Sequence, residues 1–143
     1  MLVKLILPLF VWNRKKTKAD KRIYLNKNIE RKLHYTVYNK IKKEYVGIVS
    51  EALGKKWKPI PHGSKVKCTY TLYPKSKRRT DLGNPLSIVC KFTEDALVAL
   101  SFMEDDNYNI VSEIVFLFGE VDKESPRCEL VIEEIEQSDI PTC

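Results

Sequence analysis

Apolar and polar residues alternate most regularly between positions 65 and 72. A period of two is typical of a strand that buries one of its faces. Similar alternation at 128–135 predicts a last strand, and a further strand is expected at about 110–118. The apolar positions of the first segment are Val66, Cys68, Tyr70 and Leu72.

The opening of the chain is almost continuously apolar. Residues 2–12 predict a first strand, with Pro8 placed where an edge or a bend would tolerate it. Residues 22–25 predict a short second strand, and the two can pair as a ribbon. The basic segment between them, residues 13–21, is predicted to be a loop.

Spacings of three and four residues predict two helices. The first is expected to begin after Asn26 or Asn28 and to end near position 53, before Gly54. The second is expected to begin with Asn84 as N-cap and Pro85 at the first helical position. The apolar stripes are Leu33, Val37, Ile41, Tyr45, Ile48 and Val49 in the first helix, and Leu86, Val89, Phe92 or Thr93, Ala96, Leu97 and Leu100 in the second.

These elements predict an α+β protein with a single domain over residues 1–136 and a flexible tail over 137–143. We expect a mixed β-sheet of about four to five strands packed against two main helices. A chain of 143 residues with 43% apolar residues is long enough to bury a sizeable core.

Charge divides the chain into two unequal halves. Residues 1–80 carry 22 Lys and Arg against 4 Asp and Glu, which gives +18, and residues 81–143 carry 3 against 15, which gives −12. The sum is the net charge of +6. Such asymmetry indicates a polyanion partner, such as nucleic acid, for the first half. A membrane surface fits less well, because no long amphipathic helix with a bulky apolar face accompanies the basic residues.

Two basic loops are the candidate DNA-binding segments. Each has few apolar residues and could contact phosphates, although a solvated hairpin tip is the alternative for the first loop. Their candidate DNA-binding residues are Arg14, Lys15, Lys16, Lys75, Lys77, Arg78 and Arg79.

Carboxylates follow the second basic loop. Asp81 comes directly after it, and Glu104, Asp105 and Asp106 follow the second predicted helix. Oxygen ligands suit Mg²⁺, and a basic approach would bring phosphates to the ion. The alternative is structural: Asp81 precedes a helix N-terminus, where free amides and the helix dipole favour a carboxylate, and the acidic triplet is an exposed turn.

The cysteines and the absence of a membrane segment indicate a cytoplasmic protein. Cys68, Cys90, Cys128 and Cys143 lack zinc-binding spacing and are expected to be reduced thiols. The apolar opening does not have the charge order of a signal peptide, and no run approaches the length of a membrane span.

Three motifs resemble the signature of RusA-type Holliday junction resolvases, which are small phage-borne endonucleases. They are Asp81-Leu82-Gly83-Asn84, Lys91 placed four residues before Asp95-Ala96-Leu97, and Glu104-Asp105-Asp106. The resemblance implies a Mg²⁺-dependent endodeoxyribonuclease, with Mn²⁺ as a substitute, that acts as a homodimer on four-way or branched DNA in recombination and repair. No membrane or small-molecule cofactor is implied, and the setting would be the cytoplasm of a bacterial or phage-infected cell.

The resemblance also assigns roles to residues. Asp81, Asp105 and Asp106 would be metal ligands, with Asp81, Asp106 and Lys91 as the catalytic residues. The metal would polarise the scissile phosphate and activate a water molecule, and Lys91 would neutralise charge developing on phosphorus.

The sequence departs from the family pattern at Gly83, where members typically carry a second Asp. The following helix is also about one turn longer, and Glu94 or Asp95 could replace the missing carboxylate. Two alternatives therefore stay open. One is a weakened or inactive module that still binds DNA junctions, and the other is an interaction domain whose acidic half meets a basic partner.

Overall fold

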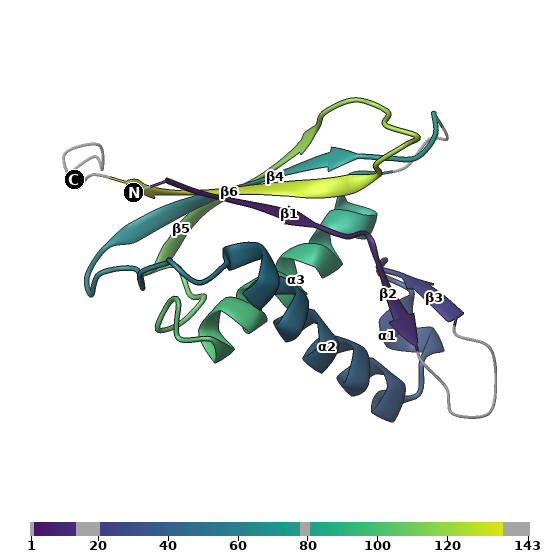
Figure 1. Cartoon of the computed structure of the whole chain (residues 1–143), viewed down its shortest axis with the longest axis horizontal. Helices are drawn as coiled ribbons and strands as arrows, with labels where there is room; N and C mark the ends of the chain where they lie inside the picture. Colours follow the sequence, from purple (N-terminus) through teal and green to yellow (C-terminus); the bar gives the residue numbers. More distant parts are fainter. Residues whose placement is uncertain (1, 14–20, 78–80, 136–143) are drawn as a thin grey trace.

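The computed structural model describes residues 2–13, 21–77 and 81–135. They form a four-stranded sheet, a two-stranded ribbon and three helices (Figure 1). The predicted α+β class with a mixed sheet and two main helices is confirmed.

The main sheet contains β1 (Leu2–Leu7), β4 (Lys65–Tyr73), β5 (Val111–Phe118) and β6 (Arg127–Ile135). Its strand order is β1-β6-β4-β5. β6 pairs antiparallel with both β1 and β4, whereas β5 runs parallel to β4 and is joined to it through α3 (Gly83–Ala99). The predicted strands near 65–72, 110–118 and 128–135 are confirmed to within a residue or so.

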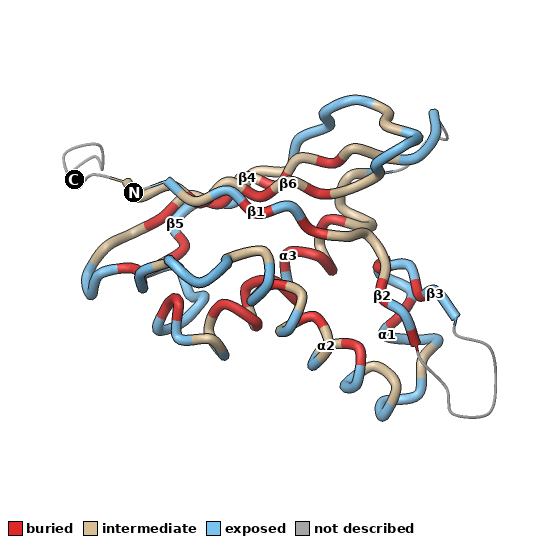
Figure 2. The backbone as a smooth tube through the Cα atoms, viewed as in Figure 1, coloured by how far each residue is buried: buried red, intermediate tan, exposed pale blue. Residues whose placement is uncertain are grey.

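Helices α2 (Tyr35–Leu53) and α3 cover one face of this sheet and enclose the core (Figure 2). The alternating apolar positions of β4 are all buried, as predicted, and so are the main apolar positions of α3. Tyr45 of α2 and Phe92 of α3 meet ring to ring, 5.9 Å between centroids. Cys68, Cys90 and Cys128 are free and buried among these residues.

The predicted strand over residues 2–12 is wrong as a single element. It divides at Pro8 into β1 and β2 (Phe10–Asn13), because proline has no N–H to donate to a sheet ladder. β2 leaves the main sheet and pairs with β3 (Lys21–Tyr24) as the predicted ribbon. The Leu25 N–H donates to the Leu9 carbonyl at 2.9 Å, which closes the base of the ribbon.

The first predicted helix is also divided. α1 (Ile29–Lys32) ends at Leu33, whose backbone is extended, and α2 begins after His34. The His34 Nδ1 accepts the Thr36 N–H at 3.3 Å, so this histidine acts as an N-cap. A cap of this kind starts a new helix without interrupting the apolar stripe, so the stripe did not reveal the break.

The start of α3 differs by two residues from the prediction. The helix begins at Gly83, and the Asn84 side chain accepts the Lys27 N–H at 3.1 Å instead of capping the helix. None of the helices in the described ranges is long and apolar enough to cross a membrane.

Candidate nucleic-acid interface

Asp81 lies at the N-terminal end of α3. Its Oδ1 accepts the Gly83 N–H at 3.0 Å, which is the capping role considered as the structural alternative. A side chain at Gly83 would extend into the space beside it, since an added Cβ would lie 3.5 Å from Asp81 Oδ1 and 3.6 Å from Lys27 Nζ. An aspartate at this position, which RusA-type resolvases typically carry, would therefore extend toward Asp81. Gly83 places no carboxylate in that space.

A second acidic group lies at the other end of α3. The Asp106 N–H donates to Asp105 Oδ1 at 2.7 Å, and partial burial together with the Asp105 and Asp95 carboxylates raises the pKa of Asp106. Asp95 is held by Lys42 of α2, with 2.8 Å between the charged atoms. A hollow of about 580 Å³ lies between α2 and α3 here, lined by Asp95, Asp105 and Asp106 together with Lys42 and Lys43.

The length of α3 separates these two groups within one chain. Its 17 residues span about 25 Å at 1.5 Å per residue. Ligands of one ion all lie within about 2–3 Å of it, so one chain does not bring Asp81 together with Asp105 and Asp106 in this structure, and their assignment as ligands of one Mg²⁺ stays a prediction. Among the described residues no three His, Cys, Asp or Glu side chains are grouped so that they could hold a metal ion.

Lys91 lies between the two groups, near the middle of α3. Its ammonium is 2.8 Å from Glu30 of α1 and about 6.0 Å from the Tyr38 ring centroid. The bond to Glu30 raises the pKa of Lys91 and lowers that of Glu30. Lys91 is half exposed and touches neither Asp81 nor Asp106 in the structure, so within one chain its observed contacts are those of an inter-helix ion pair.

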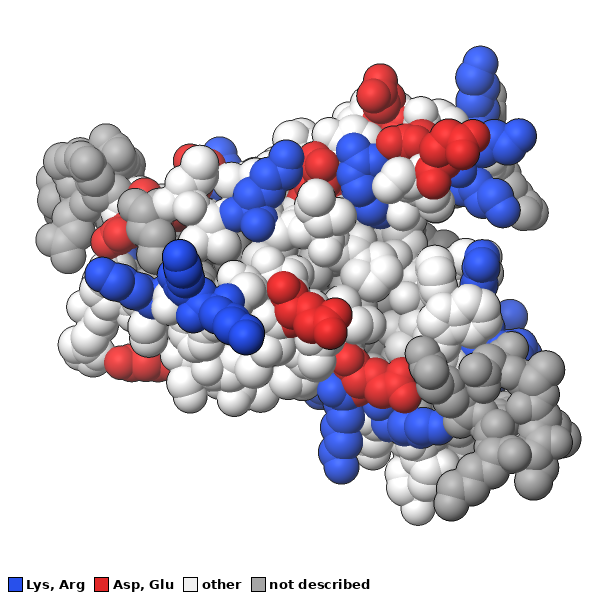
Figure 3. All heavy atoms as spheres, in the orientation of Figure 1, with Lys and Arg blue, Asp and Glu red and all other residues white. Residues whose placement is uncertain are grey.

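A groove of about 760 Å³ opens between the ribbon and the end of the main sheet. Four separate elements contribute to it: the ribbon, the end of β4, the start of α3 and the turn before β6. Lys and Arg side chains lie on both sides of the hollow at the right of Figure 3. The charged and polar lining residues are Arg22, Asn26, Lys75, Ser76, Asn84, Lys123, Glu124 and Ser125.

The structure therefore brings Lys75 of the predicted DNA-binding set to a groove that Asn84 and Pro85, at the start of α3, also line. Lys77 follows on the same loop and is exposed. The other members of that set, Arg14, Lys15, Lys16, Arg78 and Arg79, lie outside the described residues.

Sequence reasoning missed the outward face of the ribbon. Phe10, Trp12, Arg22 and Tyr24 form two cross-strand pairs, Phe10 with Tyr24 and Trp12 with Arg22. The sequence carried little signal, because Phe10, Val11 and Trp12 form a continuous apolar run in which burial alternates and hydropathy does not.

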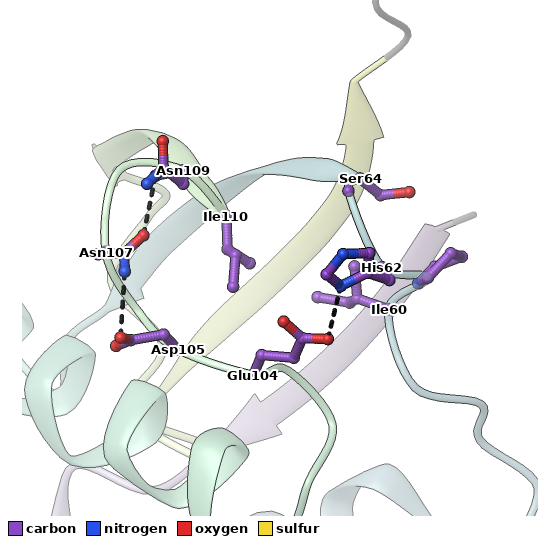
Figure 4. A pocket seen from close by; sticks show the side chains of 10 residues that line it. Ile60, His62, Ser64, Glu104, Asp105, Asn107, Asn109 and Ile110 are labelled. Atoms are coloured by element: carbon purple, nitrogen blue, oxygen red, sulfur yellow. Dashed lines mark hydrogen bonds and ion pairs between the residues drawn. The ribbon is translucent and has the colours of Figure 1, made fainter.

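A smaller hollow of about 410 Å³ lies beyond the C-terminal end of α3 (Figure 4). The His62 ring points toward Glu104, with 2.9 Å between Nδ1 and Oε1, and this contact raises the pKa of His62. Asp105 points away from that pair, toward Asn107. Both members of the ion pair are largely exposed, so the pair does not resemble a preorganised catalytic dyad.

No model of a known protein family matches the sequence. A comparison with curated proteins likewise finds no similar chain.

Proposed function

We propose that this chain recognises branched DNA and cleaves it as a RusA-like, Mg²⁺-dependent endodeoxyribonuclease that works as a homodimer in the cytoplasm of a bacterial or phage-infected cell. Support comes from the three sequence motifs, from the +18 charge of residues 1–80 and from the basic groove at the start of α3.

The observation that carries the DNA-binding part is the composition of this groove. Arg22, Lys75 and Lys123 come from three distant parts of the sequence and line one hollow of about 760 Å³. Converging cations and amide groups are what a phosphate backbone requires. Glu124 also lines the groove, so the positive charge is concentrated on the ribbon and on the loop after β4.

Cleavage places a demand on assembly, because the two acidic groups of one chain are separated by α3. In a homodimer, Asp81 of one protomer could meet the acidic group of its partner. The two-fold axis would then generate two equivalent clusters of carboxylates. Four-way junctions have two-fold symmetry of their own, which suits such a pair.

Mixing two inactive variants tests this arrangement. We expect Asp81→Asn and Asp106→Asn each to abolish Mg²⁺-dependent nicking of a synthetic four-way junction while retaining junction binding. When the two variants are mixed and allowed to exchange protomers, mixed dimers should contain one intact site, so about a quarter of wild-type nicking should return.

Recovery of nicking supports a site shared between protomers. Two inactive variants that stay inactive after verified exchange would show that the acids do not meet across a dimer. Full nicking by both single variants would overturn the assignment of these aspartates altogether.

The second candidate is a junction-binding module without cleavage. The absence of a carboxylate at Gly83 and the capping bond from Asp81 to the Gly83 N–H favour it. This candidate predicts steep salt dependence of binding and no nicking by the wild-type protein with either Mg²⁺ or Mn²⁺ at any protein concentration.

A further inference from the structure

The outward face of the β2–β3 ribbon gathers three aromatic rings around one guanidinium. The Phe10 ring centroid lies 5.8 Å from that of Trp12 and 5.9 Å from that of Tyr24. The Arg22 guanidinium lies 4.8 Å from the Phe10 centroid and 5.0 Å from that of Trp12. We call these four residues the aromatic face.

The opposite face of the ribbon already attaches it to the protein. Val11 and Ile23 pair across the two strands and are both buried in the core. The aromatic face is consequently not needed to bury the ribbon, and it remains accessible: Trp12 is 37% exposed and Tyr24 is 53% exposed. Large aromatic side chains held open to solvent beside a cation are a recurring feature of ligand surfaces.

The aromatic face is continuous with the basic groove. Phe10, Arg22 and Tyr24 line the groove, and Lys75 and Lys123 lie along the same hollow. Among the described residues Arg22 makes no ion pair, and its guanidinium lies over the Phe10 and Trp12 rings. A flat cation stacked on rings beside lysines matches a ligand that carries both planar rings and phosphates.

We propose that the aromatic face is a stacking platform for unpaired nucleobases of a branched or single-stranded nucleic acid, whose phosphates lie in the adjoining groove. This proposal deepens the proposed function and rests on it for the identity of the ligand. Bases in a continuous duplex are stacked on one another and cannot present a free face, whereas bases at a branch point or in a single strand can.

The platform predicts selectivity for unpaired bases. Removing a ring on which a base stacks typically weakens single-strand binding by about ten- to a hundredfold. Binding of a fully paired duplex depends on phosphate contacts and should be almost unaffected by the same change. The quantity to measure is therefore how much more a substitution weakens single-strand binding than duplex binding.

The experiment uses Trp12→Ala and Tyr24→Ala in the full chain, with fluorescein-labelled oligothymidylate and a blunt duplex of equal length as probes. We expect each substitution to weaken binding of the oligothymidylate by about tenfold or more and to change duplex binding less than twofold. Trp12→Phe should restore most of the loss, because it retains a ring. Tyr108→Ala is the matched control, since Tyr108 is a tyrosine 78% exposed on the loop before β5.

A direct readout comes from tryptophan fluorescence. The chain has two tryptophans, and Trp57 packs on Phe102 with 5.6 Å between centroids. In a Trp57→Phe background, Trp12 becomes the sole tryptophan, and stacking of thymine on it should quench its emission. Thermal melting followed by circular dichroism checks that each variant is folded.

Equal weakening of both probes, or no quenching of Trp12 on saturation with oligothymidylate, would overturn the platform. Either result can occur while the wild-type protein still nicks junctions, so the proposed function would stand. Conversely, Trp12-dependent binding of single strands by a protein that never nicks a junction would retain the platform and reject the nuclease.

Discussion

Gly83 leaves open space next to Asp81 where a second carboxylate would fit. Its backbone does not have the positive φ that restricts a position to glycine, so a side chain can be added without strain. The Lys27 ammonium lies close to the same space. The residue at this position therefore decides how much negative charge the N-terminal end of α3 presents.

We expect Gly83→Asp to increase the affinity of the protein for Mg²⁺ by about tenfold, because hard cations bind more tightly as carboxylate ligands are added. Gly83→Asn has the same shape without the charge and should leave the affinity unchanged. Isothermal titration with MgCl₂ measures both variants. Equal affinities in the two would show that this end of α3 does not take part in metal binding.

Glu94 is a carboxylic acid buried in the core between α3 and β4. Burial raises its pKa, and the Asp106 and Asp95 carboxylates raise it further, while hydrogen bonds from Cys90 and Tyr70 oppose the shift. The Tyr70 hydroxyl lies 3.4 Å from Glu94 Oε2, and the Cys90 thiol also contacts that oxygen. The folded chain therefore binds the Glu94 proton more tightly than the unfolded chain does.

A carboxyl with a raised pKa stabilises the folded state below its ordinary pKa of 4.5, and this contribution is lost as the pH rises through the folded-state value. Glu94→Gln cannot ionise, so it should be more stable than wild type at pH 8 and similar to it at pH 4. Urea unfolding at the two pH values measures the difference. The exposed control Glu120→Gln should not show this pH-dependent gain, and a Glu94→Gln variant that is less stable at pH 8 would contradict the assignment.

Among the elements, those with regular periodicity could be predicted from sequence and those defined by a break could not. β4 alternates over its whole length and α3 has a clear apolar stripe, so both were found within a residue or two. The split at Pro8 and the break at Leu33 and His34 depend on which backbone partners are available in three dimensions, and a local pattern does not contain that information.

The candidate site shows the same limit. Lys75 and the start of α3 are near in sequence and line the same groove. Asp106 is predicted to meet Asp81, but within one chain the 17 residues of α3 lie between them. The ribbon's aromatic face was missed because Phe10, Val11 and Trp12 are all apolar, so burial alternates there while hydropathy does not.

The turn after β5 supplies a prediction about packing. Gly119 follows the strand, and its N–H donates to the Leu72 carbonyl at 2.9 Å. A Cβ here would lie 2.6 Å from a Tyr73 ring carbon. The Arg127 guanidinium lies over that ring at 4.1 Å, and the Tyr73 hydroxyl is hydrogen-bonded to Glu129. The ring is therefore held in place where an alanine would need it to move.

We expect Gly119→Ala to lower the free energy of unfolding by about 1–3 kcal/mol through this overlap. Gly47→Ala is the matched control, because Gly47 lies within α2 with open space around its Cβ position and alanine favours helix by about 0.5–1 kcal/mol. Urea denaturation of both variants should give shifts of opposite sign. Two stabilised variants would show that Tyr73 moves aside freely.

For the whole molecule, the open edge of the main sheet is the feature most relevant to assembly. β5 pairs only with β4 among the described strands, and three of its apolar side chains, Ile114, Leu117 and Phe118, are 46%, 46% and 57% exposed. An apolar edge strand favours pairing with another chain.

If the protein forms the proposed homodimer through this edge, Ile114→Lys should weaken the dimer by about tenfold or more, since a buried lysine would have to be desolvated at the interface. Ile6→Lys is the matched control on β1, the opposite edge, where Ile6 is 58% exposed. Sedimentation equilibrium distinguishes the two. Equal weakening, or a dimer unaffected by Ile114→Lys, would place the interface elsewhere.

If the chain binds DNA as proposed, the span of α3 also sets a scale for that DNA. A DNA strand advances about 3.4 Å per nucleotide, so the roughly 25 Å between the two ends of α3 corresponds to about seven nucleotides. Phosphates that contacted both ends of α3 in one protomer would lie on different sides of a double helix. A strand lying along this helix would therefore have to leave the path of the duplex, which a branch point permits and an unbroken duplex resists.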